Sequence, residues 1–467
     1  MSCKALPGVA LIHLLCALLA CAVVTACASR PDLVRLYENS SDDPRQPPVI
    51  VIHGLAGSTL VDARTGKQFW PGSLSTLTFS NYADLAQMSA EDREGEGLVP
   101  GDLVQGVAGV DFYAALLSSL ESVGRFKRGV PGQAVGSERR RYYVLLYDWR
   151  KDNIFAVRKL HALIEQIRVD YQDPGLRVDI IAHSNGGLIA GYYLRYGPTD
   201  VLEQRNLTPW REGDLRIRRL VMLGTPNLGA VTSLERLIYG TRLALRTVPV
   251  EVMATFVTPF QALPHPLVKS ILDAQGRPVD LDIYDDKVWR DRKWSVFSPE
   301  VMSRVRGSMA TPAEGERALA GLQAGFVHNL HRAERLQWAL SAVVPANKVE
   351  IAVFGGDCQS TPGHAVLLDD GQGSRLVFRP GQVNPNRIGQ RRKPRGGPDF
   401  ERLMFEPGDG MVTRSSQLAR RPADLDRARD DFHMLPIAQT FFLCESHGRL
   451  THNLYFQNNL LYFLLSK

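Results

Sequence analysis

The sequence has little net charge and few cysteines. Its 55 Lys and Arg residues are nearly balanced by 49 Asp and Glu residues, which leaves a formal net charge of +6. This small excess, together with the lack of any nucleic-acid-binding motif in the sequence, argues against nucleic acid as a partner. Two basic clusters, at residues 139–141 and 391–395, are interpreted as solvated loops, with attraction to anionic lipid headgroups as the alternative.

Of the six cysteines, only Cys27, Cys358 and Cys444 lie beyond the N-terminal 26 residues. No group of Cys, His or acidic residues has the spacing of a metal site, so we expect neither a metal nor another cofactor. An oxidising compartment would permit a Cys358–Cys444 disulfide. The sequence leaves this pairing open, because it does not give the distance between the two side chains.

Long hydrophobic runs are confined to the N-terminus. Lys4 precedes an apolar stretch at residues 9–24, and the "VTAC" that ends at Cys27 resembles a bacterial lipobox. The resemblance implies a lipoprotein signal peptide over residues 1–26, lipidation of Cys27 and a polar tether over residues 27–46. We therefore expect a bacterial cell-envelope protein that is lipid-anchored to a membrane surface, either facing the periplasm or in the outer membrane. An uncleaved anchor is the alternative.

Short and nearly continuous apolar segments after residue 47 have the character of buried parallel strands. They are "PVIVI" at 48–52, "YYVLLYDW" at 142–149, "RVDIIAH" at 177–183, "IRRLVMLG" at 217–224 and "VEIAVFG" at 349–355. Helical patterns separate them, as over residues 154–171. This alternation predicts an α/β fold with a mostly parallel central sheet flanked by helices.

The chain from about residue 230 to residue 347 interrupts this rhythm. It carries aromatic residues and prolines but no clear strand. A long insertion between two core strands predicts a helical cap or lid, with a plain structural insertion as the alternative. The expected domains are therefore a core over residues 47–229 and 348–467, with the cap inserted over residues 230–347.

One serine, Ser184, stands between a predicted strand and a glycine-rich segment in "IIAHSNGG". A serine hydroxyl is a weak nucleophile that needs a base, an orienting acid and donors for the oxyanion. A strained strand–turn–helix, the nucleophile elbow, exposes such a serine and requires small residues two positions before and after it. Ala182 and Gly186 meet this requirement. Ser184 is therefore predicted to be a catalytic nucleophile, and a surface turn serine is the alternative.

The donors of an oxyanion hole are expected at two strand ends. The first predicted strand runs into His53 and Gly54, which makes the backbone N–H of Leu55 one candidate. The backbone N–H of Asn185, directly after the nucleophile, is the other. An ordinary strand-end turn is the alternative for the first of these sites.

The chain order of nucleophile, acid and base places the two remaining partners towards the C-terminus. Asp409 in "PGDGM" is the predicted acid, and Asp357 and Glu406 are its rivals, since any of the three could be a plain turn acid. His447 in "CESHGRL" is the predicted base, because it lies on a loop ahead of a final amphipathic helix. His452 is its rival, with helix capping as the alternative role.

Six motifs follow one another in a familiar order: "PVIVIHGLAGSTL", "FWPG", "YDWR", "AHSNGG", "LGTPNLG" and "GDGMVTRSS". Together they resemble the lecithin:cholesterol acyltransferase-like group of α/β hydrolases, which includes bacterial lipases and phospholipid acyltransferases. The resemblance covers most of the chain from residue 48 to the end. It implies an α/β-hydrolase fold and a Ser184–Asp409–His447 triad that acts on acyl lipids. It also implies that Trp70 lies near the acyl groove, although from the sequence alone Trp70 could equally be a core residue.

Two residues depart from the pattern of this group. His53 stands where the plasma enzymes of the family have proline, and Ala182 stands where their elbow begins with glycine. Both changes are towards ordinary lipases, so they favour hydrolysis over acyl transfer. We expect a lipase, a phospholipase or an O-acyltransferase that works through an acyl-serine. The alternatives are a catalytically inactive lipid- or protein-binding lipoprotein on the same fold, and a peptidase or small-ester esterase.

Overall fold

The computed structural model describes most of the chain beyond the N-terminal 30 residues. The described residues are 31–38, 43, 45–72, 80, 82–87, 97–107, 110–243, 246–342, 344, 348–369, 374–383, 398–420 and 435–466. Two compact units, residues 1–41 and 42–467, are distinguished. The first contains the short helix α2 (Leu33–Leu36). Cys27, the predicted signal peptide and the basic cluster at 391–395 lie outside the described residues. No helix in the described ranges has the length and apolar character needed to cross a membrane.

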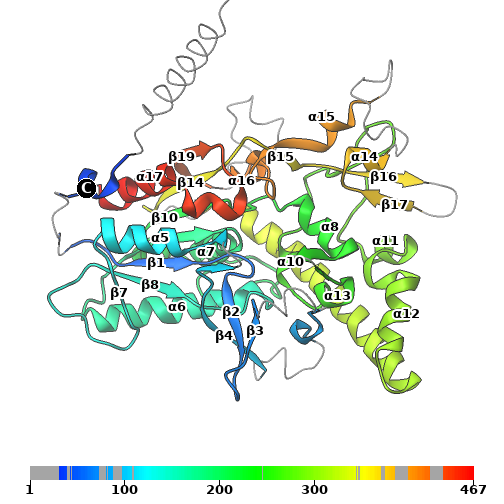
Figure 1. Cartoon of the computed structure of the whole chain (residues 1–467), viewed down its shortest axis with the longest axis horizontal. Helices are drawn as coiled ribbons and strands as arrows, with labels where there is room; N and C mark the ends of the chain where they lie inside the picture. The colour runs from blue at the N-terminus through cyan, green and yellow to red at the C-terminus, as the bar shows by residue number, and fades with distance from the viewer. Residues whose placement is uncertain are drawn as a thin grey trace, which may run out of the picture. The chain divides into compact units, whose positions relative to one another are not determined.

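A seven-stranded sheet forms the centre of the second unit (Figure 1). Its order is β19-β14-β10-β9-β1-β8-β7, and every neighbouring pair is parallel. The strands are β1 (Val49–Ile52), β7 (Lys127–Arg128), β8 (Arg141–Leu145), β9 (Val178–His183), β10 (Ile217–Leu223), β14 (Glu350–Gly356) and β19 (Ile437–Leu443). The predicted parallel α/β sheet is thus confirmed. The two edge strands, β7 and β19, are not predicted from the sequence, because β7 has two residues and β19 is only partly buried.

Helices cover both faces of this sheet (Figure 1). They are α5 (Ala114–Ser118), η2 (Ser119–Val123), α6 (Asn153–Asp170), α7 (Asn185–Tyr196) and α17 (Leu454–Leu465). Side chains alternate along each strand, so Ile50 and Ile52 of β1 pack with α6 and α7, whereas Val49 and Val51 pack with α5 and α17. Burial of both faces explains why the strands are continuous apolar runs.

Two stretches of the chain leave the sheet. Between β10 and β14 lie α8 (Val231–Tyr239), β11 (Thr241–Leu243), β12 (Arg246–Val248), α9 (Val250–Met253), α10 (Thr258–Gln261), β13 (Ile271–Leu272), α11 (Asp286–Asp291), η4 (Ser295–Phe297), α12 (Pro299–Gly307) and α13 (Pro312–Ser341). Between β14 and β19 lie β15 (Gln359–Pro362), β16 (Ala365–Asp369), β17 (Ser374–Val377), α14 (Pro380–Val383), α15 (Phe400–Met404), β18 (Phe405–Gly408) and α16 (Arg414–Gln417). The two stretches are joined, because β13 pairs with β16. They share a hydrophobic core of their own, centred on Phe260, Trp289 and Phe326. The second stretch is not predicted from the sequence, and the role of the first as a cap stays a prediction.

Smaller elements complete the described part. They are β2 (Ser58–Asp62), β3 (Gln68–Trp70), η1 (Ala83–Leu85), β4 (Leu98–Leu103), β5 (Gly106–Val107), β6 (Val110–Asp111), η3 (Gly213–Leu215) and η7 (His447–His452). Of these, β2, β3 and β4 form one antiparallel sheet directly after β1.

Arginine side chains connect the long helix α13 to the segments that flank the sheet. The helix starts with a capping box, in which Thr311 and Glu314 satisfy each other's backbone N–H groups. Further along, Arg332 donates to Asp152, the N-cap residue of α6, and to Asp200 (2.6 Å) and Glu203 (2.8 Å). One guanidinium group therefore joins α13 to the start of α6 and to the loop after α7.

The "YDWR" motif contains a buried ion pair. Arg150 and Asp148 are 2% and 8% exposed, and the guanidinium donates to both carboxylate oxygens, at 2.9 and 2.7 Å. A third donor of Arg150 reaches the carbonyl of Leu85 at 3.0 Å. The motif thus fixes the loop after β8 to η1, which explains the motif by structure rather than by chemistry.

Breaking this buried pair is expected to destabilise the fold strongly. Arg150→Met leaves the Asp148 carboxylate buried without its partner, which costs about 3–5 kcal/mol. Urea unfolding followed by circular dichroism measures the loss. Arg304→Met is the matched control, because Arg304 pairs with Glu251 at the surface and should cost less than about 1 kcal/mol. Equal losses in the two variants would contradict the structural role of the motif.

Candidate active site

Ser184 occupies the sharp turn between β9 and α7. Its backbone has φ 55° and ψ −121°, a conformation that residues with a side chain rarely adopt. The Ser184 N–H donates to the carbonyl of Leu223 at the end of β10 (2.8 Å), and the Gly187 N–H donates to the Ser184 carbonyl (3.0 Å). The turn therefore holds Ser184 at the carboxyl end of the sheet, as an elbow requires.

Close contacts with β1 explain the small residues around Ser184. A Cβ on Gly186 would lie 2.7 Å from the carbonyl oxygen of Ile52, and a Cβ on Gly54 would lie 2.8 Å from the Cβ of Ser184. The position two residues before the serine is less demanding. The methyl group of Ala182 lies in the core between the sheet and its helices, which accounts for the alanine at this place.

The structure brings Ser184, His447 and Asp409 together in one chain of hydrogen-bonding distances. His447 Nε2 lies 3.0 Å from Ser184 Oγ, and His447 Nδ1 lies 2.7 Å from Asp409 Oδ2. The second carboxylate oxygen of Asp409 accepts hydrogen bonds from the N–H groups of Met411 (3.0 Å) and Val412 (2.8 Å). The Asp409 side chain is fully buried, and these N–H groups and the imidazole stabilise its carboxylate by hydrogen bonds.

The other candidates for acid and base are placed differently. Asp357 lies 4.0 Å from Arg414, and Glu406 accepts a hydrogen bond from Ser415. His452 is exposed at the end of η7, and the residue that caps α17 is Asn453. None of these three side chains takes part in the hydrogen bonds that the structure gives around Ser184.

The two predicted oxyanion donors lie at the same small cavity. Leu55, Asn185, Ser184 and His447 all line it, and its volume is about 40 Å³. Within the described ranges neither the Leu55 N–H nor the Asn185 N–H has a hydrogen-bond acceptor. The Asn185 N–H belongs to the first turn of α7, where the helix dipole adds to its attraction for negative charge. Two unoccupied donors beside a serine hydroxyl are the arrangement that an oxyanion would fill.

A buried amide network fixes the residue after Ser184. The side chains of Asn185 and Asn153 donate to each other at 2.7 and 3.0 Å. Gln261 accepts from the Asn153 N–H at 3.0 Å, and Asn185 also reaches the hydroxyl of Tyr147 at 3.2 Å. The segment "FQALPHP" at residues 260–266, which contains Gln261, and the "YDWR" motif are therefore tied to the start of α7. Asn153 itself has no sequence signal, because its partner lies 32 residues further along the chain.

His53, the residue at the departure from the family pattern, has a packing role. Its ring stacks on Tyr147 with a centroid distance of 4.2 Å and an interplanar angle of 4°. The Tyr147 hydroxyl donates to the His53 carbonyl at 2.8 Å. Neither His53 nor Ala182 lines the catalytic cavity, so neither departure changes the cavity surface.

A tyrosine that the sequence analysis misses connects the two strand ends. The hydroxyl of Tyr113 accepts from the Gly54 N–H at 2.9 Å and lies 2.7 Å from His183 Nδ1. The His183 ring in turn lies 5.1 Å from the His447 ring, centroid to centroid. Burial lowers the pKa of His183 to about 3, with the proximity of His447 as a further cause. His183 is therefore neutral, and the Tyr113 hydroxyl donates to its Nδ1.

Trp70 is placed in the core rather than at the catalytic cavity. It is 5% exposed, and its indole N–H donates to the carbonyl of Ala56 at 2.8 Å. Its ring packs edge-on against Trp149 with a centroid distance of 5.6 Å. The residue supports the loop that carries Leu55, and it is absent from the described lining of the cavity. Its predicted contact with an acyl chain stays a prediction.

A disulfide joins Cys358 and Cys444, so the pairing that the sequence leaves open is confirmed. Cys358 lies just after β14, and Cys444 lies just after β19, three residues before His447. The bond therefore ties the loop of the candidate base to the neighbouring strand end. No group of three or more potential metal ligands occurs in the described ranges, and independence of metals stays a prediction.

Comparisons with known proteins find similarity in sequence over part of the chain and similarity in fold. The model of the lecithin:cholesterol acyltransferase family matches residues 133–265. The crystal structure of the Tle4–Tli4 complex contains a chain with a TM-score of 0.55 and 14% identity, over 90% of this chain and 98% of that one. Lipase 1 from Pelosinus fermentans matches over 90% of this chain and 99% of its own, with 11% identity and a TM-score of 0.35. No curated protein matches the chain.

The parallel sheet, the serine elbow after β9 and the structural likeness define the class of this protein. The chain is an α/β hydrolase in fold. The resemblance to the lecithin:cholesterol acyltransferase family is confirmed over residues 133–265, which include the "YDWR", "AHSNGG" and "LGTPNLG" motifs.

Loss of the disulfide is expected to lower the free energy of unfolding and to displace His447. The double variant Cys358→Ser/Cys444→Ser opens a loop with a sequence separation of 86, which costs about 2–5 kcal/mol. Unfolding in guanidinium with and without dithiothreitol measures the effect. The reductant should destabilise the wild type and leave the double variant unchanged. A wild type that is insensitive to full reduction would contradict this role of the bond.

Buried neutral histidines are expected to make stability depend on pH. Burial lowers the pKa of His53 and of His265 to about 4, against about 6.5 in an unfolded chain. As the pH falls from 6.5 to 4, the unfolded state binds protons first. The contribution of these histidines to the free energy of unfolding is therefore fully present above pH 6.5. Below pH 6.5 it declines by up to about 1.4 kcal/mol per pH unit for each histidine.

Unfolding free energies at several pH values test this dependence. His53→Phe keeps the stacking on Tyr147, and the Gly54 carbonyl still accepts from the Gly57 N–H, so this variant should show a shallower decline. His331→Gln changes an exposed histidine and should keep the wild-type slope. The same slope in all three proteins would refute the assignment.

Proposed function

We propose that this protein is a lipid-directed serine acyl-ester enzyme, either a hydrolase or an O-acyltransferase, that works through an acyl-serine. The observation that carries the proposal is the 3.0 Å and 2.7 Å chain from Ser184 through His447 to Asp409. The match to the lecithin:cholesterol acyltransferase family model supports an acyl lipid as the substrate.

The proposed reaction follows from the positions of the groups. His447 Nε2 accepts the hydroxyl proton while Ser184 Oγ attacks the ester carbonyl, and Asp409 orients the imidazole and stabilises its positive charge. The N–H groups of Leu55 and Asn185 receive the negative oxygen. His447 then gives its proton to the leaving alcohol as the C–O bond breaks. Water, or a second alcohol, attacks the acyl-serine and restores the hydroxyl.

The setting of the reaction is proposed from the N-terminal sequence. The lipobox ending at Cys27 supports a lipid anchor in a bacterial cell envelope. An anchored enzyme meets acyl lipids, either phospholipids or acylglycerols, at the membrane surface without leaving it. We expect the domain beyond residue 46 to work at that surface.

Product analysis of acyl-labelled lipid tests both the reaction and its acceptor. The purified protein is incubated with labelled phospholipid or triacylglycerol, with a sterol or diacylglycerol present as acceptor. Ser184→Ala should lower the rate by about 10⁶-fold and Asp409→Asn by about 10⁴-fold. Ser118→Ala, an exposed serine of α5, is the control that should keep full activity.

The position of the label distinguishes the remaining alternatives. Label in free fatty acid alone identifies a hydrolase, and label in a new ester identifies a transferase. Cleavage of the ester by purified Ser184→Ala protein would refute the assignment of the triad. Lipid binding without cleavage in the wild type would identify an inactive binding protein on this fold. Cleavage of short esters only would point to a small-ester esterase.

A further inference from the structure

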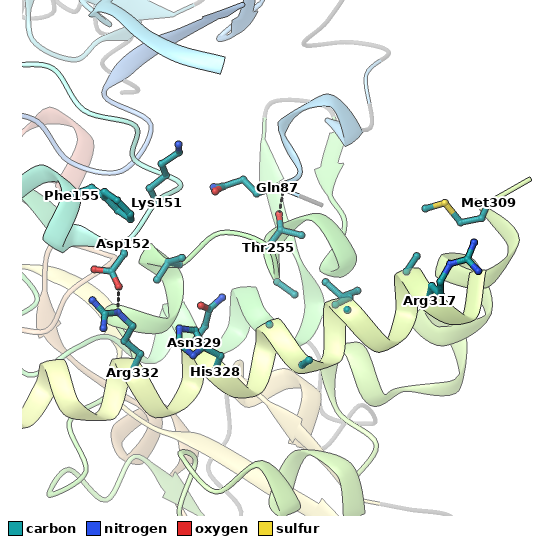
Figure 2. A pocket seen from close by; sticks show the side chains of 17 residues that line it. Gln87, Lys151, Asp152, Phe155, Thr255, Met309, Arg317, His328, Asn329 and Arg332 are labelled. Atoms are coloured by element: carbon teal, nitrogen blue, oxygen red, sulfur yellow. Dashed lines mark hydrogen bonds and ion pairs between the residues drawn. The ribbon is translucent and has the colours of Figure 1, made fainter. Parts of the chain in front are cut away.

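Figure 2 shows a second and much larger cavity, whose lining adjoins that of the small cavity at Ser184. Its volume is about 1080 Å³, at the upper end of sites that hold small molecules, whereas the catalytic cavity has about 40 Å³. One segment separates the two. Ala254, Thr255 and Val257 line the large cavity, while Thr258 and Pro259 line the catalytic cavity. The segment at residues 254–259 therefore forms a wall between the large cavity and the small cavity at Ser184.

One side of this cavity is a row of small residues on α13. Ala318, Gly321, Ala324 and Gly325 all line it. Glycine is an unfavourable residue in the middle of a helix. Neither Gly321 nor Gly325 needs a positive φ, and a Cβ on either would meet no described atom within 4 Å. No packing partner explains these two glycines, and both leave open space in the cavity.

The opposite side combines an apolar surface with an unsatisfied donor. Phe155 of α6 is a cavity-lining aromatic that is 51% exposed. Gln87 is 6% exposed, and within the described ranges its side-chain Nε2 has no hydrogen-bond partner. Its backbone N–H is held by Thr255 at 3.0 Å, and Figure 2 shows its amide group extending towards Phe155 and Lys151. A buried N–H group without an acceptor is costly, so a ligand oxygen at this place would stabilise it.

The charge at the cavity favours an anion. Of the charged side chains that line it in the described ranges, Lys151, Arg317 and Arg332 are basic and Asp152 is acidic. Arg332 is shared by three carboxylates, those of Asp152, Asp200 and Glu203. Arg317 and Arg332 are fifteen residues apart on α13, which places them about 22 Å apart along the helix axis. A row of small residues along one helix, with basic side chains at the same cavity, is complementary to an acyl chain that carries an anionic head group.

We propose that this cavity binds a long-chain amphiphile with an anionic head group. The acyl chain lies along the small-residue row of α13, and an oxygen of the head group accepts from Gln87 Nε2 beside Lys151. Both a fatty acid product and a phospholipid substrate have this chemistry. The inference rests on the proposed function for the amphiphile being substrate or product, but the binding itself requires no turnover.

Binding is measured with the full-length Ser184→Ala protein, which leaves acyl esters intact. A dansyl-labelled undecanoate serves as the fluorescent probe in detergent-free buffer. The probe and each competitor are used below their critical micelle concentrations. Oleate and oleoyl-lysophosphatidylglycerol are the competitors that distinguish product from substrate, and both should displace the probe. Monooleoylglycerol tests the charge and octanoate tests the chain length, and both should compete more weakly.

Three added substitutions locate the site. Gly321→Leu and Gly325→Leu fill the cavity while improving helix propensity, and each should weaken oleate binding by about tenfold or more. Ala320→Leu places the same side chain on an exposed position of α13 outside the cavity lining, and should change binding less than about twofold. Gln87→Leu removes a buried donor that has no partner, so it should keep the stability and weaken oleate binding by about tenfold.

Each result decides one part of the proposal. Displacement that is unchanged in both glycine variants, or no displacement by either anionic competitor, would overturn the site. Equal competition by monooleoylglycerol would overturn the anionic head group. Oleate binding as expected in a protein whose wild type cleaves no acyl ester would refute the proposed function and leave the site standing. If the wild type cleaves acyl esters but none of the substitutions changes oleate binding, the proposed function stands and the proposed site is refuted.

Discussion

The strained backbone of Ser184 is the constraint on which the surrounding structure depends. A positive φ at a serine is unfavourable and persists only where neighbouring contacts over-determine it. Here the contacts come from both adjacent strands. The Ser184 N–H is bound by the end of β10, and the end of β1 approaches so closely that Gly54 and Gly186 have no room for a side chain. The packing of three parallel strands thus builds the turn. The hydrogen bonds of the turn hold Ser184 so that its side chain lies at the small cavity.

A second level of order comes from buried polar groups that are satisfied by distant parts of the chain. Asn185 and Asn153 pair their amides, and Gln261 completes the pair from a segment more than a hundred residues away. Such groups are costly to bury without partners, and the hydrogen bonds between them hold distant segments together. The network therefore holds the start of α7, and with it the candidate oxyanion donor of Asn185, relative to the stretch that leaves the sheet after β10.

The sequence predicts the parts of this site that local patterns encode. Ser184 lies in a strand–turn–helix with small neighbours, and Asp409 and His447 follow from chain order and loop position, so the structure finds them within hydrogen-bonding distance. Tyr113 and Asn153 could not be found in this way, because each acts on a residue far away in sequence. For Trp70 the limitation of the sequence is different. A motif can mark a residue without revealing which surface it faces, and the indole of Trp70 faces the backbone of Ala56. The five apolar strands were readable because both faces of the sheet are buried, whereas the two edge strands were not.

The wall between the two cavities connects these observations. Its Val257 N–H donates to the carbonyl of Arg150 at 2.7 Å, and the Thr258 hydroxyl donates to the carbonyl of Trp149 at 2.7 Å. The "YDWR" motif thus holds the wall by its backbone, while its buried Asp148–Arg150 pair holds the motif itself. Under the proposed function, the cavity of about 40 Å³ at Ser184 would hold the reacting atoms of an ester but not its acyl chains, which need further apolar volume. The position of the wall therefore determines how much of that volume Ser184 can reach. A motif that supplies no reacting atom acts on the site through the segment that its carbonyl groups hold.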